Sequence, residues 1–103
     1  MSDLTVAHEI QRQLGMQTLA LLGATHLGGG KNYLQFRIKG CRKINFIKIV
    51  LDPNDTYSVQ FWWIGPRASV VRQVSEFEGI YCDSLHDLIE RETGLYATFH
   101  ARS

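Results

Sequence analysis

Three segments between residues 32 and 65 constrain the fold more than any other part of the chain. They are Tyr33 to Lys39, Ile44 to Leu51 and Tyr57 to Ile64. Successive side chains of a strand point to opposite faces, and the first and third segments place apolar or aromatic residues at every second position. The second segment is apolar on both faces, which is typical of a central strand. Because all three are rich in β-branched and aromatic residues, we expect three strands.

The connections between these segments are short enough to be hairpin turns. Pro53 stands where its fixed φ favours a turn, and the Asx residues around it bond their own backbone. Residues 40–43 can form the other turn. Two hairpins would give an antiparallel meander with a core face and an outer face. The outer face would carry Tyr33, Arg37, Lys39, Phe46, Lys48 and Trp62.

A helix is expected on each side of the meander. Ser2 or Asp3 can cap the first helix, over about residues 4–14, and Gly15 can end it. Asp83 or Ser84 can cap the second helix, which ends near Thr93. The sequence therefore predicts a single α+β domain over residues 1–103. Its antiparallel meander has about four to five strands, with an N-terminal and a C-terminal helix on one face.

The remaining segments give weaker signals. Residues Thr18 to Gly23 could continue a helix or form a buried strand, and we favour a strand because Gly15 interrupts the helical pattern. Residues 24–31 contain three consecutive glycines and are expected to be a mobile loop. Ser69 to Glu76 suggests a fourth strand at an edge of the sheet, and Tyr96 to Phe99 a further short strand.

Charge is distributed unevenly along a chain whose net charge is only +1. Residues 10–51 contain seven lysines and arginines and no acid, whereas residues 52–103 contain eight acids and four arginines. The basic half could form a positive patch that attracts anions. Alternatively, the two halves could neutralise each other across the fold.

Several classes of protein are poorly supported. No apolar run approaches the roughly 18 residues that span a bilayer, and no secretory signal is recognisable. Cys41 and Cys82 are isolated and lack the CxxC spacing; they could form one bridge, but nothing requires it, and reduced thiols are the default expectation. We therefore expect a cytoplasmic protein that does not contact a membrane.

No catalytic or cofactor motif is recognisable. Gly28 to Lys31 fails as a phosphate loop because a strand, and not a helix, follows the lysine. Glu76 and Glu78 could point the same way, but paired acids without a pocket are weak evidence for catalysis or metal binding. Cys82 precedes a helix, although a structural role is favoured, and the four histidines show no ligand spacing. The sequence predicts no cofactor or metal and gives no argument for an enzyme.

The adjacent Trp62 and Trp63 are more informative, because neighbouring strand residues cannot both face the helices. We expect Trp62 to point outward, although a register slip of one residue would exchange it for Trp63. The candidate binding face consists of Tyr33, Arg37, Lys39, Arg42, Lys43, Phe46, Lys48 and Trp62. An exposed aromatic cluster favours contact with a protein, including a second copy of the chain. The alternative is single-stranded nucleic acid, which basic and aromatic sheets also bind.

Four segments carry a resemblance to known proteins. They are residues 17–38 (QTLALLGATHLGGGKNYLQFRI), 51–62 (LDPNDTYSVQFW), 78–85 (EGIYCDSL) and 93–96 (TGLY). The chain resembles a family of small proteins encoded by bacteriophages, prophages and related mobile elements. This resemblance implies a role inside a bacterial host cell, but it supplies no catalytic signature and no functional residues. It is compatible both with docking on a host or phage protein and with accessory nucleic-acid binding.

Overall fold

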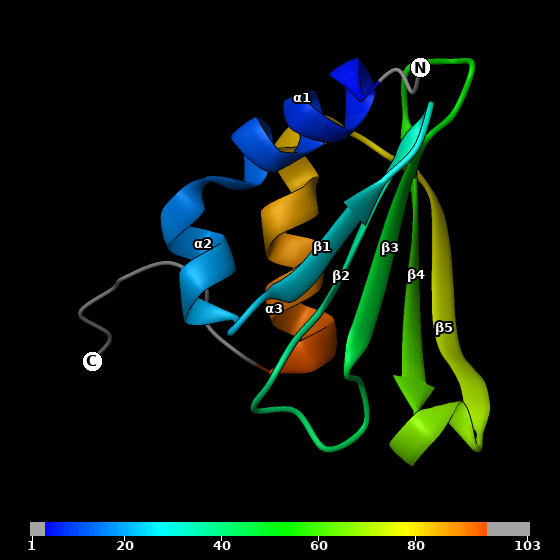
Figure 1. Cartoon of the computed structure of the whole chain (residues 1–103). Helices are drawn as coiled ribbons and strands as arrows, with labels where there is room; N and C mark the ends of the chain where they lie inside the picture. The colour runs from blue at the N-terminus through cyan, green and yellow to red at the C-terminus, as the bar shows by residue number, and fades with distance from the viewer. Residues whose placement is uncertain (1–3, 95–103) are drawn as a thin grey trace.

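The structure is a computed structural model that describes residues 4–94. Five antiparallel strands form one sheet in the order β1-β2-β3-β4-β5, so each strand pairs with its neighbours in the sequence. Three helices lie on one face of the sheet, and the described residues place no helix on the other (Figure 1). The predicted α+β meander with flanking helices is therefore confirmed. The elements are α1 (Thr5–Leu14), α2 (Met16–Leu21), β1 (Thr25–Gly29), β2 (Tyr33–Arg37), β3 (Phe46–Leu51), β4 (Tyr57–Ile64), η1 (Pro66–Ala68), β5 (Val71–Ile80), η2 (Cys82–Ser84) and α3 (Leu85–Thr93).

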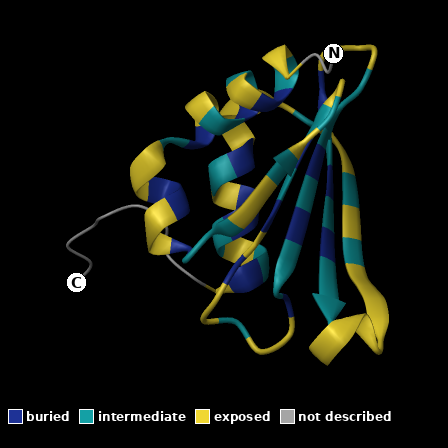
Figure 2. Cartoon of the chain, viewed as in Figure 1, coloured by how far each residue is buried: buried dark blue, intermediate teal, exposed yellow. Residues whose placement is uncertain are grey.

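The hydrophobic core lies between the sheet and the helices (Figure 2). Two rows of buried side chains cross the three central strands: Leu34, Ile49 and Val59, and Phe36, Ile47 and Phe61. The helices cover these rows with side chains at helical spacing: Ala7, Ile10 and Leu14 from α1, and Leu85, Leu88 and Ile89 from α3. Full burial of each large side chain contributes about 1.5–3 kcal/mol. The alternation in the sequence thus identified the buried face of the central strands correctly.

The segment from Thr18 to Gly23 is not a strand, and this prediction is wrong. Residues 18–21 belong to α2, which follows α1 after the single residue Gly15, and Leu22 and Gly23 form the turn after it. Gly15 has φ 89° and ψ 147°, so it ends one helix and redirects the chain into the next. Leu19 and Leu22, three positions apart, are both buried. This short apolar run fits a helix as well as a strand, and its packing decides between them.

Residues 24–31 are not simply a loop, because they include strand β1. Its register with β2 shifts between Thr25 and Gly28, and His26 between them has φ 55°. Gly29 lies directly beneath α1: a Cβ atom built there would be 2.6 Å from the Cβ of Ala7. Glycine is therefore needed where the helix crosses the edge of the sheet.

Several element boundaries differ from the sequence-based expectation. Strand β3 begins at Phe46 instead of Ile44, and Ile44 is a buried residue of the preceding loop. Strand β5 extends to Ile80 instead of Glu76, and its predicted edge position is confirmed.

The helix ends were predicted more closely than the caps. Gly15 ends α1, and Gly94 ends α3 in the left-handed conformation with φ 71°. Ser84 is the residue before α3, but its side chain makes no capping hydrogen bond. The proposed caps Ser2 and Asp3 and the strand at 96–99 lie outside the described residues.

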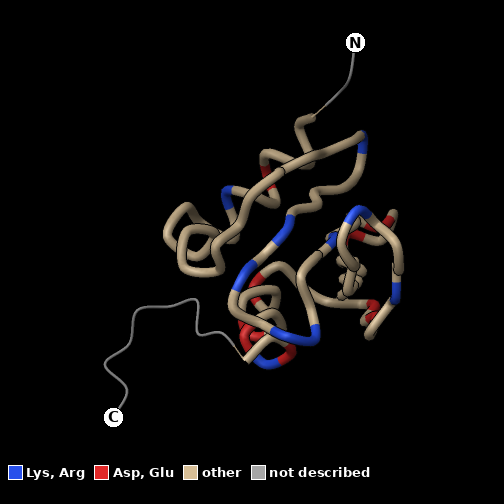
Figure 3. Tube along the Cα trace, turned by 60° about the horizontal axis from the view of Figure 1, so that its bottom comes forward, with Lys and Arg blue, Asp and Glu red and all other residues tan. Residues whose placement is uncertain are grey.

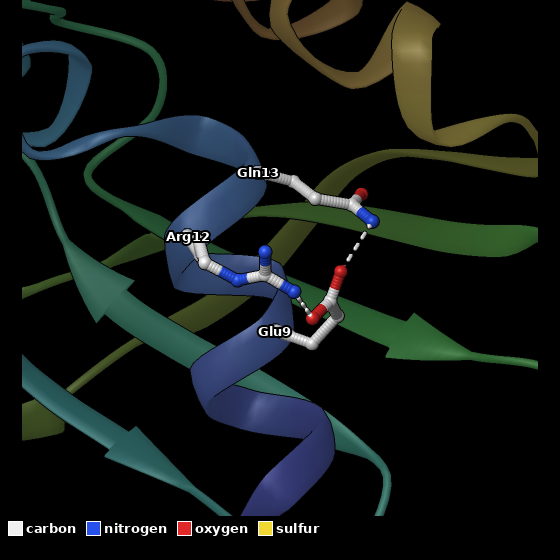
Figure 4. Close-up of polar contacts among 3 residues, drawn as sticks. All are labelled: Glu9, Arg12 and Gln13. Carbon is white, nitrogen blue, oxygen red and sulfur yellow. Dashed lines mark hydrogen bonds and ion pairs between the residues drawn. The ribbon is translucent and has the colours of Figure 1, made fainter.

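A polar cluster lies on the exposed side of α1 (Figure 4). The Arg12 guanidinium donates a hydrogen bond to Glu9, and Gln13 Nε2 donates to Glu9 Oε2 at 3.0 Å. The hydrogen bond from Arg12 is the main reason that the pKa of Glu9 is lowered from its usual value. These contacts support the helix from its solvent side and leave its apolar side on the sheet.

The close approach of α1 to β1 gives a stability prediction. Gly29→Ala should lower the free energy of unfolding by about 1–3 kcal/mol, because the added methyl group overlaps a helical Cβ that cannot rotate away. Urea denaturation of the two proteins measures this difference.

Gly28→Ala is the matched control, because its added Cβ would lie 3.7 Å or more from its neighbours. It should change stability by less than about 0.5 kcal/mol. Equal changes in the free energy of unfolding for the two substitutions would contradict the close approach of α1 to Gly29.

Candidate interaction face

The face of the sheet opposite the helices, here called the outer face, is ordered by the strand register. Arg37, Phe46 and Trp62 lie side by side on β2, β3 and β4. The next row is Gln35, Lys48, Gln60 and Glu76, and the following one is Tyr33, Val50 and Ser58. Cross-strand neighbours of this kind have Cβ atoms about 4.5–5.5 Å apart. The pairing therefore gathers basic and aromatic side chains from three strands.

Five residues of the predicted binding face lie together on the outer face: Tyr33, Arg37, Phe46, Lys48 and Trp62. Lys39 follows the end of β2, and its backbone N–H donates to the carbonyl of Leu22 at 3.0 Å. Arg42 and Lys43 are exposed residues of the β2–β3 loop. These two extend the basic surface at the end of the sheet but do not belong to its strands.

The aromatic rings of the outer face are held in place by neighbouring polar groups. Lys48 Nζ lies 4.5 Å from the centre of the Tyr33 ring, which is a cation–π contact. Trp62 Nε1 donates a hydrogen bond to Gln60 Oε1 at 3.2 Å. Tyr33, Phe46 and Trp62 are all only partly exposed. The rings therefore contribute to a continuous surface and do not project from it.

Trp63 points to the other side of β4, toward the helices. It pairs with Arg72 of β5, whose guanidinium carbon lies 5.5 Å from the centre of the Trp63 ring. Trp62, by contrast, pairs with Phe46 on the outer face. The register thus places Trp62 on the outer face, where we expected it from the sequence.

Part of the outer face is acidic, which the sequence did not indicate. Glu76 accepts hydrogen bonds from Gln60 and Gln73, each at 3.2 Å. In the sequence, Glu76 and Glu78 were only weak evidence for catalysis or metal binding, and the poorly distinguished faces of this strand did not indicate a surface role. The register shift between Phe61 and Trp62 explains this, since the bulge interrupts the alternation of β5. The outer face is consequently basic at β2 and β3 and acidic at β5.

Among residues 4–94, ion pairs with the acidic half do not neutralise the basic half of the chain. Ion pairs join Arg12 to Glu9 and Arg91 to Glu92, and His86 Nε2 lies near Glu90. None of them involves the basic residues of the candidate binding face. Figures 1 and 3 place the β2–β3 loop beside the C-terminal end of α3, which carries several acids. Long-range attraction therefore offsets part of the loop's charge, whereas Arg37 and Lys48 lie on the sheet itself.

Asn45 fixes the end of β3 against β4 and so positions the outer-face rings. Its backbone N–H donates to the carbonyl of Trp62 at 3.0 Å. Its side chain bonds both backbone groups of Ile64: Nδ2 donates to the carbonyl, and Oδ1 accepts from the N–H, each at 2.8 Å. The side-chain amide thus makes the two hydrogen bonds that the backbone of a strand residue would make, and it keeps Phe46 and Trp62 side by side.

The described residues gather no evident catalytic or metal centre. An open hollow of about 580 Å³ at the β3–β4 turn is lined by Asp52, Ser58 and Glu78, among others. Ser58 donates to Asp52 there at 2.7 Å. His86 lies elsewhere, on α3, with Nε2 3.1 Å from Glu90 Oε2. Within residues 4–94, no three His, Cys, Asp or Glu side chains are close enough to share a metal ion.

The clearly shifted pKa values belong to the helix side of the sheet. Besides Glu9 on α1, burial raises the pKa of the Tyr57 hydroxyl, and the ring of Tyr57 is nearly inaccessible. Neither group adjoins the outer face. Both shifts follow from local packing and hydrogen bonding and do not indicate an acid–base site.

Comparisons with known proteins found no matching family model, no similar curated protein and no similar solved structure. The resemblance to phage and mobile-element proteins therefore stays a prediction. No helix in the described part of the chain combines the length and hydropathy needed to cross a bilayer. Both cysteines are free thiols, Cys41 partly buried and Cys82 exposed.

The two hydrogen bonds of the Asn45 amide lead to a second stability prediction. Asn45→Ala should lower the free energy of unfolding by about 1–3 kcal/mol, because a partly buried N–H and carbonyl both lose their partner. Thermal unfolding followed by circular dichroism measures this effect. Asn32→Ala is the control, since only its backbone carbonyl is used, to accept from Leu51. A loss no larger than that of the control would exclude this role for Asn45.

Proposed function

We propose that this chain is a small binding protein without a catalytic role, which docks through its outer face on an acidic surface of another protein. We place it, following the sequence resemblance, in the cytoplasm of a bacterium that carries a phage or mobile element. The observation that supports this most is the row Arg37, Phe46 and Trp62, which combines a cation with two aromatic rings on a face that no helix of residues 4–94 covers. Interfaces are enriched in arginine and in aromatic residues.

Charge defines the chemistry of the partner. Arg37 and Lys48 have no ion pair with a carboxylate of residues 4–94. A partner that presents acids around an apolar centre would pair with these cations and cover Phe46 and Trp62. Rim charges raise the association rate, whereas buried aromatic residues supply most of the affinity.

Nucleic acid is the second candidate, because the same cations could bind phosphates. Two features favour a protein. The rings are flush with the surface and are held by Lys48 and Gln60, so they are not free platforms on which bases stack. In addition, Glu76 on the same face repels phosphate groups.

The experiment compares four immobilised proteins in a nuclease-treated bacterial lysate: wild type, Trp62→Ala, Lys48→Ala and Met16→Ala. Met16 is an exposed apolar residue on the helix side and serves as the matched control. A protein retained by wild type and by Met16→Ala is then purified, and its affinity is measured by calorimetry. Trp62→Ala should weaken binding by about 30-fold or more, and Lys48→Ala less, with an effect that shrinks at high salt.

Three results would contradict the proposal. One is equal retention of every captured protein by all four baits. Another is a dimer of this chain that Trp62→Ala abolishes, which would make the outer face a contact between copies. The third is salt-sensitive binding of labelled single-stranded DNA, duplex DNA or RNA that quenches tryptophan fluorescence and is lost in Lys48→Ala, which would establish the nucleic-acid alternative.

A further inference from the structure

A second surface, remote from the centre of the outer face, lies along strand β5. This strand pairs only with β4, so the backbone groups on its other side have no strand partner among residues 4–94. It has ten residues, whereas β1 at the opposite edge has five. A long strand with an open edge is a template for another strand.

Exposed apolar side chains are concentrated at this edge. Val71 and Val74 of β5 are 55% and 39% exposed. Val70 and Tyr81, which flank the strand, are 51% and 65% exposed. A folded monomer gains nothing from such exposure, and a neighbouring strand would cover these side chains.

The order of charges along β5 identifies the strand that fits. Arg67 and Arg72 lie at or before its N-terminal end, whereas Glu76 and Glu78 lie toward its C-terminal end. A second β5 in antiparallel orientation would bring the basic end of each strand beside the acidic end of the other. A parallel arrangement would instead place like charges together. The edge is therefore complementary to itself, as an interface with two-fold symmetry requires.

We propose that two copies of this chain associate through antiparallel pairing of their β5 strands, forming one continuous ten-stranded sheet. The two outer faces then lie on the same side of this sheet, so the contact is compatible with partner binding but independent of it. The bulges in β5 shorten the regularly paired segment.

A single strand contact buries less than the roughly 1,200–2,000 Å² of a standard interface. We therefore expect a reversible dimer with a dissociation constant of about 10–100 μM.

Sedimentation equilibrium over a wide range of protein concentration tests the proposal. Wild type should dimerise, and Val74→Glu or Val71→Glu should raise the dissociation constant at least tenfold, because each places a carboxylate beside the acidic end of the other strand. The matched control is Leu27→Glu, which changes an apolar side chain of similar exposure (42%) on the opposite edge strand. It should dimerise like wild type.

A charge reversal tests the orientation of the two strands. Arg72→Glu should weaken the dimer at least tenfold, because it places an acid at the basic end of each strand, beside the acidic end of the other. Hydrogen exchange of wild type adds a readout that needs no variant, since amides of residues 71–80 should become more protected as concentration rises.

The proposal is overturned if wild type stays monomeric at several hundred micromolar, a range well above the expected dissociation constant. It is also overturned if Leu27→Glu or Trp62→Ala, and not Val74→Glu, abolishes the dimer, or if concentration-dependent protection appears outside β5. Edge amides that are protected in a monomer would show that another segment of the same chain covers them. Loss of partner binding in Trp62→Ala with an intact dimer would separate the two proposals.

Discussion

Burial of the central strands on one side only is the constraint on which the rest of the structure depends. Phe36, Ile47 and Phe61 form a row that needs an apolar cover, and α1 and α3 supply it from the same face. With the helices gathered there, the opposite face must remain compatible with water. Its side chains achieve this by covering one another, as Lys48 does with Tyr33 and Gln60 with Trp62. The same surface is then available to a partner, because no element of residues 4–94 lies over it.

Separation of charge along the chain becomes separation of charge in space, because the strand order follows the sequence order. The basic segment supplies β2, β3 and the loop between them, and the acidic segment supplies β5 and α3. The charge of each surface consequently changes along one direction. Across the strands of the outer face, it changes from cations to carboxylates. Along the open edge of β5, it changes from arginine to glutamate. Under the two proposals, these directions, more than the net charge of +1, would decide which partners fit.

The parts of the fold that sequence predicts well are those in which side chains alternate without interruption. Leu34 and Phe36 on β2, or Val59 and Phe61 on β4, identify the core directly. Strand β1 was missed because its glycines carry no side-chain signal, and its pairing is made by the backbone alone. The segment of α2 was misassigned because the apolar run from Leu19 to Leu22 has only four residues, which is too short for its periodicity to separate helix from strand. Of the candidate site, the cations and rings were identified, whereas the acidic contribution of Glu76 was hidden by the bulge in β5.

The strand order also bears on how the chain assembles. Every strand pairs with the one that precedes it, so the sheet grows by local steps, and such topologies fold faster than those with distant pairings. Yet the core needs α3, whose Leu85, Leu88 and Ile89 come after all five strands. During synthesis the buried rows therefore stay partly open until the last helix emerges. A nascent chain would expose the apolar face of a nearly complete sheet, and the final closure, not strand pairing, would be its most vulnerable step.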